Sequence, residues 1–466
     1  MLAELTRAPA RMRINFVIVS LFLGGMMFFG GASRPDVISL PVVRLASVVM
    51  IAIALIQIDR QQWREIRLPA LFLLGVAAII AVQLIPLPPQ VWASLPGRAV
   101  YLDAMRAAGI DGLWRPLSLT PDLTLNALLA TLPPIAAVLA LGLIGRVLQV
   151  LLVPLLLIAI GLNAMVGLLQ IASNAPYFYD ITNPDAAVGF FSNRNHLAVL
   201  LAIGFPCLAC WAALPHSDPA FRRTRVWLAL CAAASLFPLL LTAGSRAGLL
   251  LGLIGAVAAL GVGVSKTARE AESGGGRLRI RLVALIPLVV GAIAILATIA
   301  LSRDVALYRL LQGAEAGQRS AYLPIYLTMV KDFFPAGAGF GSFDSVFRAY
   351  EPLQSVTVEY LNQAHNDLLQ ILIEGGITAA AMLFLFLVWF VVRSWGLWRH
   401  KVRSPGELLG RTGSVVALLI MLSSLVDYPL RTPWLAVLMA VACCWMLPRR
   451  AAGGEEKEKG LAAPAA

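Results

Sequence analysis

Long uninterrupted apolar runs constrain this chain more than any other feature of its sequence. Each run covers about twenty residues, the length that a helix needs to cross the hydrocarbon core of a bilayer. Hydrophobic residues make up 59% of the 466 positions and charged residues only 13%, whereas soluble domains carry roughly 25% charged residues. We therefore expect a membrane protein, and a soluble globular fold is excluded.

The runs predict an all-α polytopic membrane protein with about twelve transmembrane helices. The short segments of alternating polarity that a membrane β-barrel requires are absent from the sequence. We expect a single membrane domain over residues 1–450, a large loop within it at residues 302–366, and a disordered tail at residues 451–466. The predicted spans lie near residues 15–33, 38–58, 68–87, 122–145, 147–173, 196–214, 226–243, 247–265, 281–301, 367–392, 412–427 and 432–448.

The net charge of +12 predicts the orientation of the chain in the membrane. With the N-terminus in the cytoplasm, about two thirds of the 37 lysine and arginine residues fall in cytoplasmic segments, as the positive-inside rule requires. We therefore expect a multi-pass protein of the bacterial inner membrane with both termini in the cytoplasm. The basic residues orient the chain, and we expect no nucleic-acid partner.

The large external loop is expected to form a lid over the bundle. Residues 318–334 have helical periodicity, and Ser342 is placed to cap a second short helix at residues 343–350. The intervening segment Pro335-Ala-Gly-Ala-Gly-Phe-Gly341 predicts a turn, because no helix continues through that composition. Long ordered loops between closely linked helices are usually functional.

Four arginines are expected at the external surface, although distant parts of the sequence supply them. They are Arg194, Arg246, Arg319 and Arg431. A guanidinium is planar and permanently charged, so it suits phosphate oxygens, and helix N-termini add a positive dipole. Any single arginine has an alternative role in capping a helix or extending to the interface. The set of four favours an anion site.

A polar stripe enters the membrane at the predicted span that follows His365. Asp367, Gln370 and Glu374 share one helical face, which must therefore contact protein or water. His365 lies at the mouth of this helix, where an imidazole can accept a proton from a sugar hydroxyl; a helix cap is the alternative. His196 is expected to support Arg194. The external histidines and carboxylates lack metal-ligand spacing, so no metal site is predicted.

The sequence resembles the O-antigen ligase and O-antigen polymerase superfamily of bacterial membrane glycosyltransferases. The resemblance covers about residues 185–430 and rests on the combination of several short stretches. These are Phe191-Ser-Asn-Arg-Asn-His-Leu-Ala198, Thr242-Ala-Gly-Ser-Arg-Ala-Gly248, Arg319 followed by Asp332 to Phe343, Ala364-His-Asn-Asp-Leu-Leu-Gln370, and Glu374-Gly-Gly376.

The resemblance implies a helical fold of the GT-C type that transfers a glycan from undecaprenyl pyrophosphate at the periplasmic face, without metal, cofactor or nucleotide sugar. It assigns Arg194, Arg246 and Arg319 to the pyrophosphate and His365 to catalysis. The residues expected to support them are Asn193, Asn195, His196, Ser245, Asn366, Asp367, Gln370, Glu374, Asp427 and Arg431.

The acceptor distinguishes the members of this superfamily, and here the sequence favours a polymerase of O-antigen or exopolysaccharide. The pattern from His365 to Gln370 is commoner among polymerases, and Glu374 precedes Gly375-Gly376 where ligases carry a later glutamate. A ligase that attaches polymer to lipid A core in lipopolysaccharide biosynthesis is the alternative. The expected partners are therefore the lipid-linked glycan, an acceptor glycan or lipid A core, the bilayer and polysaccharide-assembly proteins.

Two further alternatives remain open from the sequence. A protein O-oligosaccharyltransferase would share the donor and use a protein acceptor. A flippase for lipid-linked oligosaccharides would also have about twelve spans, and it would explain Arg44, which lies within the second predicted span. The clustering of ionisable residues at the external end and the lack of an internal repeat favour an enzyme.

Overall fold

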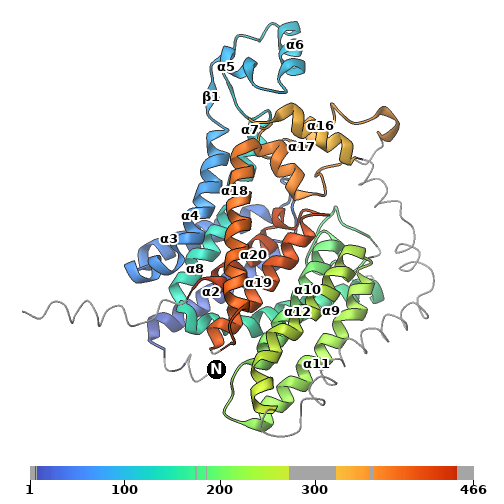
Figure 1. Ribbon diagram of the computed structural model, residues 1–466. Coiled ribbons are helices and arrows are strands. Elements are labelled where there is room, and N and C mark those ends of the chain that lie inside the picture. The colour runs from blue at the N-terminus through green and yellow to red at the C-terminus, as the bar shows by residue number, and fades with distance from the viewer. Residues whose placement is uncertain are drawn as a thin grey trace, which may run out of the picture.

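The computed structural model of the protein describes residues 6, 8–173, 176–184, 186–271, 322–356, 361–402 and 404–448 (Figure 1). Nearly all of its elements are helices. The first half contains α2 (Ala10–Phe29), α3 (Leu40–Gln57), α4 (Arg60–Val82), β1 (Pro86–Leu87), α5 (Pro89–Ser94), α6 (Ala99–Ala107), β2 (Arg115–Pro116), α7 (Pro121–Leu129), α8 (Leu132–Gln149) and α9 (Leu152–Ser173). The second half contains α10 (Arg194–Ala213), α11 (Pro219–Thr242), α12 (Arg246–Ala271), α16 (Leu323–Phe333), α17 (Phe343–Phe347), η1 (Leu353–Ser355), α18 (Asp367–Trp398), α19 (Pro405–Ser423), η2 (Pro429–Arg431) and α20 (Pro433–Met446).

The predicted all-α polytopic class is confirmed. Within the described ranges, nine helices are long and apolar enough to cross a membrane, with α7 and α8 counted as one. Two shorter apolar helices, Arg246–Val262 and Pro433–Met446, coincide with two more predicted spans. The predicted span at 281–301, the first part of the large loop and the tail at 451–466 lie outside the described residues.

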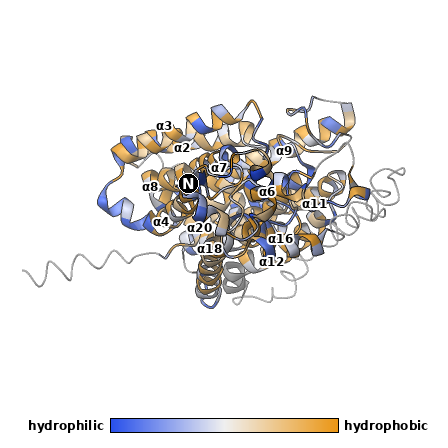
Figure 2. Ribbon diagram, turned by 90° about the horizontal axis from the view of Figure 1, so that it is seen from above, coloured by the Kyte–Doolittle hydropathy of each residue, from blue (hydrophilic) through white to orange (hydrophobic). Residues whose placement is uncertain are grey.

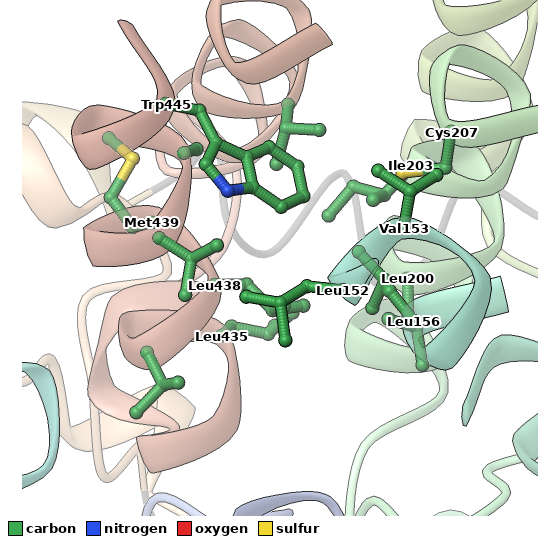
Figure 3. Close-up of a cluster of buried hydrophobic side chains, with 14 of the residues drawn as sticks. Leu152, Val153, Leu156, Leu200, Ile203, Cys207, Leu435, Leu438, Met439 and Trp445 are labelled. Carbon is green, nitrogen blue, oxygen red and sulfur yellow. The ribbon is translucent and has the colours of Figure 1, made fainter. Parts of the chain in front are cut away.

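The main core of the bundle is formed by apolar side chains from several helices. Buried side chains of α9, α10 and α20 meet there, among them Leu156, Leu200 and Leu435 (Figure 3). Other helices, such as α3 and α18, leave large apolar side chains on the outside. Figure 2 colours the ribbons by hydropathy, and hydrophobic residues, in orange, predominate along helices such as α3. Such an exposed surface matches lipid, in which apolar side chains carry no penalty.

Helix α18 is interrupted at Gly376, and the turn after α16 satisfies the interrupted backbone. Gly376 has φ 56° and ψ −143°, which is not helical. The carbonyls of Ile373 and Glu374 accept hydrogen bonds from the amides of Ala338 and Gly339, both at 2.9 Å. The amide of Ile377 donates to Pro335 O, also at 2.9 Å. Irregular backbone at this depth persists only where protein groups satisfy it, so the turn and α18 form one unit.

Replacing Gly376 by alanine is expected to destabilise the protein. An added Cβ would lie 2.1 Å from Pro335 O, at a positive φ that other residues rarely adopt. The backbone strain alone costs about 1 to 3 kcal/mol. Thermal unfolding in detergent should show a lower midpoint for Gly376→Ala than for Gly24→Ala, where the added Cβ meets nothing within 4 Å. Equal midpoints for the two variants would show that the interruption at Gly376 accommodates a side chain without strain.

The predicted lid over the end of the bundle is present in its described part. Helices α16 and α17 lie over the beginning of α18 (Figure 1). Tyr326, Met329, Phe343 and Phe347 form a second apolar cluster with Ile373 of α18. The first helix begins at Leu323 within the described residues, and the second ends at Phe347, earlier than predicted.

Ser342 does not act as the predicted side-chain cap of α17. It occupies the residue before the helix, but its hydroxyl donates to Gly339 O at 2.6 Å and accepts no helix amide. The amide of Ser342 donates to the same carbonyl, Gly339 O, at 3.2 Å. The serine therefore stabilises the glycine-rich turn and contributes no cap to the helix.

A buried arginine, Arg98, connects the lid to the segment between α4 and α7. The segment contains β1, α5, α6 and β2, with β1 and β2 paired antiparallel. Arg98 donates to Leu117 O at 2.6 Å and to Gly337 O at 3.2 Å, and its guanidinium lies 5.7 Å from the ring centre of Phe333. Burial lowers the pKa of Arg98 to about 10. The arginine thus connects this segment to the turn that contacts α18.

Candidate active site

His365 lies immediately before α18, in a backbone conformation that places its ring against the α19–α20 connection. Its φ is 49°, a left-handed conformation that is uncommon for any residue other than glycine. The next residue, Asn366, caps α18 by accepting the amide of Leu369 at 3.1 Å. Nδ1 of His365 lies 3.2 Å from Oδ1 of Asp427, and the histidine side chain is 14% exposed. The imidazole is therefore oriented by a carboxylate and still reachable.

The predicted polar stripe on α18 is a buried network. Asp367, Gln370 and Glu374 are each at most 3% exposed. Gln370 donates to Glu374 Oε1 at 2.9 Å and accepts the amide of Ala364 at 2.9 Å. The Ser424 hydroxyl donates to Asp367 Oδ2 at 3.0 Å. The helical spacing thus identified side chains that contact protein, and they fix the segment that carries His365.

Arg431 forms ion pairs with both carboxylates of this network. Its Nε lies 3.3 Å from Asp367 Oδ1 and its Nη2 lies 3.2 Å from Glu374 Oε2. Burial acts to lower the pKa of Arg431, but the two carboxylates outweigh it and raise the pKa above its usual value. Sequence reasoning placed this arginine with the external anion-binding set and also among the supporting residues. Its ion pairs are with two carboxylates of α18, and its role in the site stays a prediction.

Arg194 and Arg246 begin two helices that pack directly on each other. Gly248 of α12 approaches α10 so closely that an added Cβ would lie 2.3 Å from Ala198 Cβ. A Cβ on Gly244 would lie 4.0 Å from Nη1 of Arg194, so the Arg194 guanidinium reaches the turn before Arg246. Arg194 is half-buried and Arg246 is exposed. Two positive helix ends and two guanidiniums therefore adjoin.

Side chains at these two helix starts explain several other predicted residues. The side chain of Asn193 caps α10 by accepting the amide of Asn195 at 2.8 Å. The Ser245 hydroxyl accepts the amide of Gly248 at 3.0 Å and so stabilises the first turn of α12. Asn195 is half-buried, with its amide held in the Asn193 cap. Arg319 lies outside the described residues.

His196 contacts the His365 region. It is 0% exposed, its Nδ1 lies 2.9 Å from the Thr432 hydroxyl, and its ring centre is 5.4 Å from that of Tyr428. The ring of Tyr428 is in turn 4.8 Å from that of His365. His196 was expected to support Arg194, two positions earlier. Its side-chain contacts instead connect the start of α10 with His365.

Two buried polar residues of α9 that the sequence reasoning missed position the segment before Arg194. Gln170 accepts the amides of Val188 and Gly189, at 3.1 and 2.9 Å. Asn163 accepts the amide of Phe190 at 3.1 Å. Their seven-residue spacing puts them on one helical face, as in the stripe of α18. The same search applied to the apolar run at 147–173 identifies them.

Gln83, just after α4, is a third missed residue. It is 3% exposed, donates to Glu374 O at 3.1 Å and accepts the amide of Phe340 at 2.8 Å. The glutamine therefore holds the turn after α16 against the interrupted part of α18. One isolated glutamine at the end of an apolar run carries no periodic signal, so the sequence alone does not single it out.

Within the described part of the chain, no group of three or more His, Cys, Asp or Glu side chains is placed to hold a metal ion. The carboxylates nearest His365 already have assigned partners, since Asp367 and Glu374 bind Arg431, and Asp427 contacts His365. The expected absence of a metal or cofactor stays a prediction.

The sequence model of a family described as O-antigen ligase matches residues 228–384. This region of the chain is therefore similar to the O-antigen ligase family. The match covers about a third of the chain, from α11 into α18, and includes Arg246, His365 and Glu374. Arg194, Asp427 and Arg431 lie outside it and adjoin it in the fold. No curated protein matches the chain.

The matched family indicates a membrane enzyme of the glycosyltransferase type, and the matched residues include His365 and Glu374. The match begins inside α11 and ends inside α18. Residues outside the matched segment also contribute to the site. Tyr428 contacts His365, and Thr432 contacts His196.

Proposed function

We propose that the protein transfers a glycan from undecaprenyl pyrophosphate to an acceptor hydroxyl, with inversion at the anomeric carbon and without a metal. The observation that carries the proposal is the His365–Asp427 contact of 3.2 Å at the end of the bundle where α10 and α12 present Arg194 and Arg246. A base and a phosphate-binding pair at one end are the two elements that this transfer requires.

His365 supplies the base. If Nδ1–H donates to the carboxylate of Asp427, Nε2 carries the free lone pair and receives the proton of the acceptor hydroxyl. The acceptor oxygen then forms a bond to the anomeric carbon as the bond from that carbon to the pyrophosphate breaks. The electron pair of the broken bond leaves with undecaprenyl pyrophosphate. Asp427 stabilises the imidazolium that results.

Arg194 and Arg246 are proposed to stabilise the leaving group. Charge accumulates on the pyrophosphate as its bond to the sugar breaks, and fixed donors aimed at such charge often contribute the most to catalysis. Arg194 lies two positions before His196 in α10, and His196 connects through Tyr428 to His365 by ring distances of 5.4 and 4.8 Å. The start of α10, which carries Arg194, therefore contacts the same Tyr428 that contacts the base. Arg319 is proposed as a third phosphate ligand.

Arg246→Ala is expected to lower kcat/KM for the lipid-linked donor by about 100-fold, because one charge-stabilising donor is lost. The rate of glycan transfer in proteoliposomes measures the effect. Arg106→Ala is the matched control, since Arg106 is an exposed arginine of α6 whose guanidinium lies 3.4 Å from the carboxylate of Asp103. Equal rates for the two variants would remove Arg246 from the site.

The acceptor is proposed to be another lipid-linked repeat, which makes the protein a polymerase of O-antigen or exopolysaccharide. The residues from His365 to Gln370 support this proposal through the pattern that polymerases share. A ligase that uses lipid A core is the second candidate, and the description of the matched family as O-antigen ligase favours it. Both reactions use the same donor and the same base.

We propose that the site faces the periplasm of a bacterial inner membrane. Arginines at the opposite end of the bundle support this orientation, since that end would then be the basic, cytoplasmic side. These arginines donate hydrogen bonds to the carboxyl ends of helices. Arg225 donates to carbonyls at the end of α10, Arg411 to Leu397 O at 3.1 Å in α18, and Arg393 to Met446 O at 2.6 Å in α20. Basic residues concentrate on the cytoplasmic side.

The flippase alternative loses its best support in the fold. Arg44 was the residue that a transporter explained better than an enzyme. It lies in the first turns of α3, not at mid-span, and donates a hydrogen bond to the side chain of Asn126 in α7. Its partner is therefore an amide of a neighbouring helix, as expected of a structural contact.

Glycan analysis of a deletion strain tests the proposed acceptor. A polymerase predicts lipid A core that carries a single repeat, or loss of exopolysaccharide. A ligase predicts bare lipid A core and accumulation of polymer on the lipid carrier. If the deletion strain makes the wild-type amounts of lipid A-linked polysaccharide and of exopolysaccharide, the proposed function is wrong.

A further inference from the structure

The ring of Tyr428 lies between the two histidines of the candidate site. Its centre is 4.8 Å from His365 with an interplanar angle of 60°, and 5.4 Å from His196 with an angle of 85°. The tyrosine is 8% exposed and His196 is 0% exposed. Edge-to-face contacts of this kind restrict how the rings rotate relative to one another.

The main chain of Tyr428 also holds the carboxylate that orients His365. Its amide donates to Asp427 Oδ1 at 3.0 Å, the oxygen that lies 3.2 Å from His365 Nδ1. The same residue therefore fixes the acceptor atom through its backbone and contacts the imidazole through its ring. A hydrogen bond at Nδ1 alone leaves the ring free to pivot about that contact. A packed aromatic ring removes this freedom.

His196 supports the far side of Tyr428 at a cost in stability. Its Nδ1 is fixed by the Thr432 hydroxyl at 2.9 Å, whereas its Nε2 has no hydrogen-bond partner among the described residues. A buried polar atom without a partner costs about 1 to 3 kcal/mol, so such groups call for a specific explanation. An apolar side chain would fill the start of α10 without this cost.

We propose that Tyr428, supported by His196, is a positioning residue that holds the His365 imidazole in the orientation for proton transfer. This inference rests on the proposed function and adds two residues to it. Asp427 sets the position of Nδ1, and the ring of Tyr428 sets the plane of the imidazole. Thr432 fixes His196, and His196 keeps Tyr428 from moving away from His365.

Tyr428→Leu tests the role of the ring, and Tyr428→Phe is the conservative variant. Glycan transfer is measured in proteoliposomes with undecaprenyl-pyrophosphate-linked glycan extracted from the deletion strain. Tyr428→Leu is expected to lower kcat by about 10- to 100-fold with the KM for the lipid-linked donor unchanged. Tyr428→Phe should restore most of the turnover, since the phenyl ring makes the same contacts.

His196→Ala and Thr432→Val test the support behind the tyrosine. Both are expected to lower kcat in the same direction, and Thr432→Val less so because it removes a single hydrogen bond. Phe221→Leu is the matched control, since Phe221, in the first turn of α11, is also an aromatic neighbour of a histidine. Its ring centre is 4.3 Å from that of His216, which lies in the connection from α10 to α11. It should leave kcat unchanged.

Three results would overturn the inference. Tyr428→Leu could turn over at the wild-type rate, it could raise KM with kcat unchanged, or Tyr428→Phe could be as slow as Tyr428→Leu. Thermal unfolding in detergent checks that each variant is folded, and the phenylalanine variant keeps the test decisive if the leucine variant is not. If the wild-type protein transfers no glycan, the proposed function itself fails.

Discussion

His365→Ala is expected to lower the turnover of glycan transfer by a factor of about 100 to 10,000, the usual contribution of a positioned general base. The variant removes the group that accepts the proton of the acceptor hydroxyl, and it leaves the arginines at the starts of α10 and α12 in place. The KM for the lipid-linked donor should therefore change little. Initial rates in proteoliposomes, at saturating acceptor, measure both parameters.

The histidine variant should remain folded, because the side chain of His365 is partly exposed and lies outside the helices. Thermal unfolding in detergent checks this. His216→Ala is the matched control, since His216 lies in the connection between α10 and α11, at the opposite end of α10 from His196. A His365→Ala protein that keeps more than about a third of the wild-type turnover would show that His365 is not the base.

Arg431→Met is expected to reduce the free energy of unfolding by about 3 to 5 kcal/mol, the usual cost of removing one partner from a buried ion pair. Asp367 and Glu374 lie 3.3 and 3.2 Å from the guanidinium and are buried. Without Arg431, two carboxylates remain close together in a site with little access to water. Thermal or denaturant unfolding in detergent measures the loss.

Arg348→Met is the matched control for this prediction. Arg348 also pairs with a carboxylate, that of Asp344 at 2.9 Å, but its side chain is 60% exposed, and exposed pairs contribute at most about 1 kcal/mol. Adding Asp367→Asn and Glu374→Gln to Arg431→Met should restore much of the lost stability, because no buried charge is then left unpaired. If Arg431→Met is as stable as Arg348→Met, the network does not hold the start of α18.

The sequence predicts those parts of the fold that depend on local composition and periodicity. Span length and hydropathy identify the membrane helices because the bilayer imposes both. Helical spacing identifies Asp367, Gln370 and Glu374 as one buried face, because a polar stripe in lipid has to find protein partners. The same reasoning correctly placed a turn at residues 335–341, where glycine and proline exclude a helix.

The sequence does not reveal which distant groups become partners. The turn at 335–341 packs against the interruption at Gly376, and Arg431 pairs with the stripe on α18, but neither pairing leaves a periodic signal. His196 is assigned to its neighbour Arg194 when only chain proximity is known. Tertiary packing instead sends its ring toward Tyr428, because the start of α10 lies beside η2 and the start of α20.

Transfer by the purified protein in proteoliposomes tests the central proposal most directly. The assay supplies undecaprenyl-pyrophosphate-linked glycan and, in separate reactions, a second lipid-linked repeat or lipid A core. Wild-type protein is predicted to release undecaprenyl pyrophosphate and to form the longer glycan with one of these acceptors, and to do so with EDTA present. His365→Ala is predicted to form no longer glycan under the same conditions. Movement of the intact lipid-linked glycan across the bilayer without bond cleavage, or equal transfer by wild type and His365→Ala, would contradict the proposal.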